Sequence, residues 1–399
     1  MPRTAPRRRA TRHERVRSLD REPVVVTTAA RPAPDPGPDP GPDPAPDPEP
    51  MREEVVPGPT GAAAGPELTV SVPDREPVQS RLLVALWVLV VAGGLAALVA
   101  AMIPRGPDWL DGAGAVAVVT AYSWALAART GGRPVIFGGL ALVLGLLVLL
   151  LDQDYLCTGA AVMTCVVSAV LGVMATTPAV RFSRAARECV VAVVIAAIGA
   201  MATIGFDPVV SVVRFEYVTL GLAMLGAFGV VYRLGAGLHG LGRRGLVVVA
   251  ICGVLLAVTL LYAEMLRRYG SQDLVDHLLG GVRWSRDHLG AFPRPIEAVL
   301  GVPALAWGCH MRARRRQGWW LCAFGVAATA PVANALVNPA ISLLECGLSV
   351  LYALVVGLVI GYVVIRTDLA LTGSRGQGGR RLEEAAAVRP EPPRTAALL

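Results

Sequence analysis

Lysine is absent from this chain of 399 residues, and all 37 of its basic residues are arginine. Without lysine, no Schiff base can form on a lysine amine and no phosphate-binding loop can carry its usual lysine. Charged residues make up 17% of the chain, whereas about a quarter of the residues of a soluble globular protein are charged. The sequence therefore excludes lysine-dependent catalysis and disfavours a soluble fold.

Histidine and cysteine are too few and too scattered for the common catalytic and metal sites. None of the five histidines lies between positions 14 and 238, which leaves that stretch without the general base of a membrane acyltransferase. The seven cysteines form no CxxC or Cys/His pair and fall within or beside apolar stretches. We expect no disulfide framework, no metal centre and no cofactor, and we interpret the cysteines as small buried apolar residues.

Apolar residues are abundant: 54% of the chain is hydrophobic, and its mean hydropathy is +0.55. Proline and charge gather at the two ends, which divides the chain into an Arg/Pro-rich arm (1–80), a multi-pass membrane domain (81–366) and a tail (367–399). We expect the arm and the tail to be disordered and cytoplasmic. A Pro-Asp repeat at 33–50 predicts an extended spacer within the arm.

A tetrapeptide, Arg-Glu-Pro-Val, occurs at 21–24 and again at 75–78, on either side of this spacer. It is either a docking motif for a protein partner of the arm or a chance recurrence in a chain rich in arginine and proline.

Apolar runs long enough to cross a bilayer follow one another closely from Leu82 onward. They predict an all-α fold, a polytopic membrane bundle of about ten transmembrane helices behind the disordered N-terminal arm. The predicted helices are 82–103, 113–129, 134–151, 155–176, 189–206, 213–233, 246–264, 295–311, 319–337 and 343–365.

Arginine placement predicts the orientation of this bundle. With the arm in the cytoplasm, twelve arginines fall in inner loops and seven in outer loops or at outer helix ends. We therefore expect a plasma-membrane protein with both termini cytoplasmic. Its net charge of +7 indicates contact with anionic lipid headgroups rather than with nucleic acid.

Carboxylates are biased toward the predicted outer face, which is where acid–base, cation or sugar chemistry could occur. Between residues 82 and 366 only Glu188 falls on the inner side. The remaining acidic residues of this stretch fall on or near the outer side: Asp108, Asp111, Asp152, Asp154, Asp207, Glu216, Glu264, Asp273, Asp276, Asp287, Glu297 and Glu345.

The one substantial outer loop, residues 264–294, predicts an amphipathic helix lying on the membrane with Trp284 at the interface. Arg267 and Arg268 are two of its five arginines, which could bind a phosphate headgroup. The alternatives are a surface helix with solvated charges and, at Asp273 and His277, a metal site.

The last predicted helix carries a four-residue stripe that begins at Glu345 and ends in the pair Gly357 and Gly361. Small residues permit close helix approach, so the stripe should face another helix and direct Glu345 toward the bundle. A carboxylate in that place is a functional candidate. The alternative is that Glu345 lies at headgroup level, where the helix N-terminus favours a negative charge.

Asn334 and Asn338 precede that helix at a spacing of four, and Pro331 interrupts the hydrogen bonding one turn earlier. Paired amides on a proline-broken helix beside a glutamate could bind a substrate or an ion at the outer leaflet. Hydrogen bonding between helices would account for the same residues.

The arm, the Ala/Val/Leu/Gly-rich helices and the arginine-only basic residues together resemble actinobacterial conserved membrane proteins rich in alanine, arginine and proline. The resemblance is one of composition and layout over the whole chain, and it implies no activity and no roles for individual residues.

Two functional hypotheses remain from the sequence. The first is a transporter-like carrier, or a non-catalytic partner in an envelope assembly, with its polar site near the outer leaflet. The second is an enzyme acting on a polyprenyl-phosphate-linked substrate at the outer face. Glycosyltransferases of that type carry an acidic residue in the first outer loop, where this chain has Asp108 and Asp111 in a loop of about nine residues. No catalytic residue can be assigned from the sequence.

Overall fold

The computed structural model describes residues 77–103, 107, 109–236, 242–314, 318–372 and 391–398. Most of the predicted arm lies outside these residues, as do its Pro-Asp repeat, the first copy of the tetrapeptide and Asp108. The second copy, 75–78, overlaps the start of α1 at Pro77. Within them the chain is helical and has no strand, so the all-α prediction is confirmed there.

Fourteen helical elements follow one another in the described residues. In chain order they are α1 (Pro77–Ala101), α2 (Leu110–Arg129), α3 (Pro134–Leu151), α4 (Asp154–Met174), α5 (Phe182–Ile204), α6 (Val212–Val231), the π turn η1 (Tyr232–Ala236), α7 (Gly242–Tyr269), α8 (Gln272–Leu289), the π turn η3 (Glu297–Gly301), α9 (Val302–Arg312), α10 (Gly318–Phe324), α11 (Val326–Val337) and α12 (Leu343–Thr372).

Nine helical spans among the described residues are long and apolar enough to cross a membrane, with α10 and α11 forming one of them. The tenth predicted helix, 295–311, corresponds to η3 followed by α9, which contain five and eleven residues. Pro303 lies in the first turn of α9 and has no N–H to donate to the carbonyl one turn earlier, where the π turn occurs. The chain is a multi-pass membrane protein.

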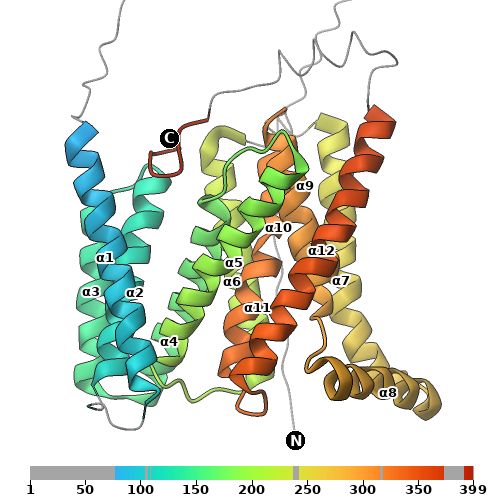
Figure 1. Ribbon diagram of the computed structural model, residues 1–399, viewed down its shortest axis with the longest axis horizontal. Coiled ribbons are helices and arrows are strands. Elements are labelled where there is room, and N and C mark those ends of the chain that lie inside the picture. The colour runs from blue at the N-terminus through green and yellow to red at the C-terminus, as the bar shows by residue number, and fades with distance from the viewer. Residues whose placement is uncertain are drawn as a thin grey trace, which may run out of the picture. The chain divides into compact units, whose positions relative to one another are not determined.

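Both ends of the helical domain lie on the same side of the bundle (Figure 1). We call the end where α1 begins and α12 finishes the inner end, and the opposite end the outer end. The nine spans and η3–α9 together cross the bundle ten times. Because ten is even, the chain ends at the inner end, where α1 begins.

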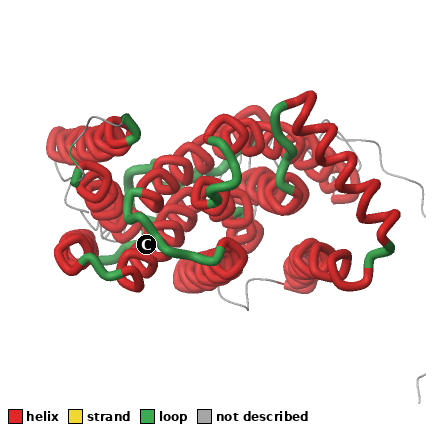
Figure 2. The backbone as a smooth tube through the Cα atoms, turned by 90° about the horizontal axis from the view of Figure 1, so that it is seen from below, coloured by secondary structure: helices red, strands yellow, loops and turns green. Residues whose placement is uncertain are grey.

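The helix predicted in the large outer loop is present as α8 and lies across the direction of the other helices (Figures 1 and 2). The Ser271 hydroxyl caps it by accepting from the N–H of Leu274 at 3.4 Å. It ends at Gly290, whose φ of +78° is a left-handed conformation that glycine adopts readily. Leu274, Leu278 and Trp284 are exposed on α8, which is the pattern of a helix at a membrane surface.

Close backbone approach holds the last helices together. A Cβ atom on Gly301 would lie 2.2 Å from the backbone nitrogen of Ala328, so only glycine permits η3 to pack this tightly against α11. Gly357 packs in the same way against Val302, and Gly361 against Ala306. The prediction that the glycine stripe of the last helix faces another helix is confirmed.

The C-terminal region differs from the disordered tail predicted for 367–399. α12 continues to Thr372, and residues 391–398 contact the inner end of the bundle. Charge pairing explains why residues 391–398 contact the bundle. Glu391 pairs with the buried Arg312, and Arg394 pairs with the buried Glu188. Composition alone cannot detect such pairs.

Candidate functional site

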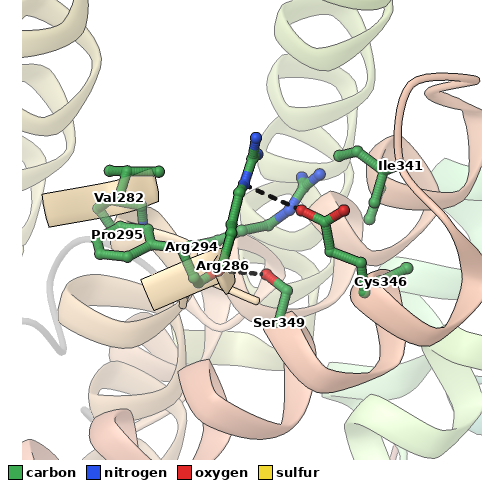
Figure 3. Close-up of a pocket in the computed structure, with 10 residues that line it drawn as sticks. Val282, Arg286, Arg294, Pro295, Ile341, Cys346 and Ser349 are labelled. Carbon is green, nitrogen blue, oxygen red and sulfur yellow. Dashed lines mark hydrogen bonds and ion pairs between the residues drawn. The ribbon is translucent and has the colours of Figure 1, made fainter. Parts of the chain in front are cut away.

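A pocket of about 140 Å³ opens at the outer end, where α8, the loop after it, α11 and α12 meet (Figure 3). Its polar lining consists of Arg286 on α8, Arg294 in the loop, and Glu345 and Ser349 on α12. Apolar side chains, including Val282 and Ile341, complete the wall. Two arginines and one carboxylate therefore line a space large enough for a small polar ligand.

Arg286 and Glu345 form an ion pair across this pocket, with Nε and Oε1 3.0 Å apart (Figure 3). Arg286 lies in the last turn of α8 and Glu345 in the first turn of α12, so each charge is also favoured by the dipole of its own helix. The two side chains are 52% and 23% exposed. The pair is thus accessible from the outer end, and solvent screens much of its attraction.

Arg294 is held deeper and more firmly. Its Nη1 donates to the carbonyl of Pro331 at 3.1 Å, and its Nε lies 3.9 Å from Oε1 of Glu297. The loop that carries it is fixed to α12, because the hydroxyl of Ser349 donates to the carbonyl of Phe292 at 2.7 Å. Arg294 therefore connects the pocket to the helices beneath it.

Glu297, in the π turn η3, is a buried carboxylate with 1% of its surface exposed. Its Oε1 has Arg294 as a charge partner at 3.9 Å but accepts no hydrogen bond. An ionisable group placed inside a membrane bundle is costly unless it is paired or has a function. The unfilled acceptor on Glu297 can take a proton, a water molecule or a ligand donor.

Asn334, on α11, is another buried residue with a polar atom that has no hydrogen-bond partner. Its Oδ1 accepts from the hydroxyl of Thr219 on α6 at 3.2 Å, while its Nδ2 has no partner. Because η3 packs against α11, this unfilled donor and the unfilled acceptor of Glu297 belong to adjacent elements. Orphaned buried polar atoms are rare, and two on neighbouring elements indicate a place built to receive a polar partner.

The structure separates the two asparagines that the sequence placed on one helical face. α11 ends at Val337, and Asn338 is its C-terminal cap with ψ of 110°. Its Oδ1 accepts from the N–H of Ala340 at 3.1 Å, so it closes the turn before α12. The interpretation as paired amides is therefore wrong for Asn338, because Pro339 requires an extended residue before it.

Two other predicted residues that the structure describes, Asp111 and Arg268, do not line the pocket. α2 begins at Leu110, three residues before the predicted start, so Asp111 lies in its first turn, where its Oδ1 accepts from the N–H of Gly112 at 2.6 Å. Arg268 pairs with Glu264 at 2.6 Å on its own helix, with both side chains outside the pocket. The side chain of Arg267 lies outside the described residues, as does Asp108.

Sequence reasoning placed Arg286 and Arg294 only among the five loop arginines that could bind a phosphate, and Glu297 only among the outer-face carboxylates. It selected neither Ser349 nor Thr219 for the site. Two further signals pointed to Arg294 and Glu297. Arg294 lies between two prolines, which is a rigid setting for a long side chain, and it precedes Glu297 by three residues. Thr219 carried no such signal, because a threonine in an apolar helix is unremarkable until its partner is known.

No group of three or more His, Cys, Asp or Glu side chains in the described part of the chain could hold a metal ion. In α8, Nδ1 of His277 contacts the backbone carbonyl of Asp273 at 2.7 Å. All seven cysteines are buried and free, which confirms their interpretation as apolar core residues. No family model, no curated protein and no solved structure matches this chain.

Proposed function

We propose that this protein is a carrier of the cell envelope that admits a small polar solute at its outer end. The observation that carries the proposal is the pair of unfilled buried atoms, Oε1 of Glu297 and Nδ2 of Asn334, whose neighbours Arg294 and Ala335 line an open pocket. The partly exposed ion pair of Arg286 and Glu345 lines the same pocket. Carriers commonly bind their substrates where membrane helices are interrupted, and here η3 and Pro331 interrupt two of them.

A purely structural role accounts less well for these residues. A helix contact needs no carboxylate, and leaving a buried polar atom unpaired costs about 1–3 kcal/mol. Two such atoms on adjacent elements therefore lower stability unless a ligand, water or proton fills them during the working cycle. In this proposal Glu297 is the group whose protonation or ligand contact changes, and Arg294 holds its charge when no ligand is present.

An enzyme acting on a lipid-linked phosphate is the second candidate, and the position of α8 favours it. α8 lies across the outer end with exposed apolar side chains, and it also contributes Arg286 to the pocket. A polyprenyl chain could lie along such a helix while its phosphate meets the two arginines.

The proposal includes a plasma-membrane location with both termini in the cytoplasm. It rests on the excess of arginine at the inner end, which follows the usual distribution of basic residues around membrane helices. Anionic lipid headgroups would then be the partners of the inner arginines.

Depletion of the protein in its host, followed by mass spectrometry of envelope lipids and polyprenyl-linked intermediates, separates the two candidates. A carrier of a small solute leaves these intermediates unchanged. Accumulation of a single lipid-linked intermediate would replace the carrier proposal with the enzyme.

Complementation of the depleted strain tests the site itself. Glu297→Gln removes the charge at nearly constant size, so we expect normal insertion and lost function. Glu264→Gln is the matched control, because that carboxylate pairs with Arg268 outside the pocket. Full complementation by Glu297→Gln would remove the buried carboxylate from the mechanism.

A further inference from the structure

Three charged side chains are buried at the inner end, opposite the pocket described above. Arg129 is the last residue of α2, Glu188 lies near the start of α5, and Arg312 is the last residue of α9. Their exposed fractions are 3%, 1% and 1%. Each of them contacts the C-terminal segment, by which we mean residues 391–398.

Arg312 holds the carboxylate of Glu391 in the manner in which arginine binds oxyanions. Its Nη2 donates to Oε2 at 2.5 Å and its Nε to Oε1 at 3.4 Å, so one edge of the guanidinium faces both oxygens. The opposite side is fixed by the hydroxyl and carbonyl oxygens of Thr176, at 2.8 and 3.1 Å. The guanidinium carbon lies 3.4 Å from the ring centroid of Trp319. An arginine fixed this way is preorganised for a carboxylate or a phosphate.

Arg129 contributes a second positive charge that the segment does not neutralise. Its Nη1 donates to the carbonyls of Pro393 and Ala396 at 2.8 and 2.6 Å, and its Nε to that of Met174 at 3.1 Å. Its Nη2 is buried and has no partner. Arg129 is also close enough to Arg312 and Glu391 for each to act on it electrostatically.

The charges of this group do not balance. Arg394 pairs with Glu188 at 2.6 Å, and the single carboxylate of Glu391 pairs with Arg312, so Arg129 has carbonyl acceptors but no carboxylate of its own. A phosphate group carries nearly two negative charges and three acceptor oxygens, so it matches two guanidinium groups better than one carboxylate does.

The segment has the features of an exchangeable occupant. Polar contacts hold it at Glu391, Arg394 and the carbonyls of Pro393 and Ala396, Leu398 packs against the core, and Pro393, Thr395 and Ala397 are exposed. Without it, Glu188 would keep the N–H of Thr177 at 2.8 Å and Arg187 at 3.1 Å. Arg312 would instead lose its carboxylate partner, and Arg129 would lose two carbonyl acceptors.

We propose that Arg129 and Arg312 form a phosphate-binding site at the inner end, for which the carboxylate of Glu391 competes from the chain's own C-terminal segment. The ligand is the phosphate group of a soluble compound or of a lipid headgroup. Binding of the phosphate displaces residues 391–398, and return of the segment closes the site.

Equilibrium dialysis of the purified full chain with radiolabelled inorganic phosphate tests this proposal. A tethered competitor acts at an effective concentration of roughly millimolar, so Glu391→Gln should tighten phosphate binding by about tenfold. Arg312→Gln or Arg129→Gln, added to Glu391→Gln, should abolish it. Glu264→Gln, which alters a carboxylate that pairs with Arg268 away from both sites, is the control and should leave it unchanged.

Equal phosphate binding by the unmodified chain and by Glu391→Gln would overturn the proposal. Because a buried arginine variant can fail to fold, a synthetic peptide of residues 391–399 gives a second test on the Glu391→Gln protein. The peptide should compete with phosphate, and the same peptide carrying Glu391→Gln should not; equal competition by both would also overturn the proposal.

Vesicles distinguish the two sources of the phosphate group. If phosphatidylglycerol vesicles displace labelled phosphate from the Glu391→Gln protein and phosphatidylcholine vesicles do not, the ligand is an anionic headgroup. If neither displaces it, the ligand is a soluble phosphate compound.

Discussion

Nε of Arg286 lies 3.0 Å from Oε1 of Glu345, and this ion pair joins the last turn of α8 to the first turn of α12. A second polar contact joins the same two helices, because the hydroxyl of Tyr352 on α12 donates to the carbonyl of Leu289 at 2.8 Å. The pair thus fixes the surface helix over the pocket while remaining partly open to solvent. A charged pair that solvent can reach is suited to the entrance of a pocket.

Substitution of Glu345 should affect function far more than stability. Glu345→Ala should insert at normal levels and lower the free energy of unfolding by no more than about 1 kcal/mol, because exposed ion pairs contribute about 0.2–1 kcal/mol. It should nevertheless abolish complementation. The exchanged double variant, Arg286→Glu with Glu345→Arg, should recover only part of the stability, because each charge then opposes the dipole of its own helix, and it should not recover the function.

Thermal unfolding in detergent and complementation in the host measure these two effects. If Glu345→Ala complements fully, the carboxylate serves only as a partner of the surface helix, and the pocket entrance needs no charge there.

Asn334 and Asn338 should respond to substitution in opposite ways. Asn334→Leu keeps the branching of the side chain and removes a buried amide whose Nδ2 has no partner, so the melting temperature should stay the same or rise. Thr219 remains satisfied in this variant, because its hydroxyl also donates to the carbonyl of Phe215 at 2.7 Å. Function should be lost, since the ligand's acceptor would find no amide.

Asn338→Ala is the matched control for that variant. It removes the contact with the N–H of Ala340, so it should lower stability slightly and leave function intact. A functional Asn334→Leu protein would show that the amide serves packing alone.

Hydropathy was sufficient to predict the helices of the bundle, because a lipid environment requires every backbone polar group to be satisfied within helices. All ten predicted segments coincide with helices, and so does the amphipathic α8. The site was harder to predict. Glu345 and Asn334 could be selected from their spacing. The spacing of Arg294 and Glu297 also marks a local pair, but the burial of Glu297 depends on how η3 packs against α11, which the neighbouring sequence does not reveal.

The contact of residues 391–398 with the inner end was not predicted, because it too depends on packing and not on the local sequence. The stretch after residue 366 is polar and low in apolar residues, which by composition predicts disorder. Residues 391–398 are placed by Arg129, Glu188 and Arg312, which lie far away in the chain. Each of these buried charges needs a partner of opposite charge or an acceptor, and this requirement becomes apparent only once the helices are assembled.

Deletion of residues 1–70 should leave the membrane domain folded. The first described helix, α1, begins after them at Pro77. We expect the truncated chain to insert at normal levels with an unchanged melting temperature, as measured by fluorescence-detected size exclusion after heating. Loss of the monodisperse peak would mean that the arm is required for the fold.

Two glycines of α12 provide a matched test of how the last helices pack. A Cβ atom on Gly357 would lie 2.6 Å from Cβ of Val302, which is part of the well-packed α9, so the helices must separate to accept it. Gly357→Ala should therefore lower the free energy of unfolding by about 1–3 kcal/mol, the usual cost of overpacking.

Gly347, also on α12, is the matched control, because no atom lies within 4 Å of the position that its Cβ would take. Gly347→Ala should thus be neutral or stabilise the protein by up to about 1 kcal/mol, because alanine loses less backbone entropy in a helix. Thermal unfolding of the two variants side by side measures the difference, and equal melting temperatures would contradict the close approach of α12 to α9.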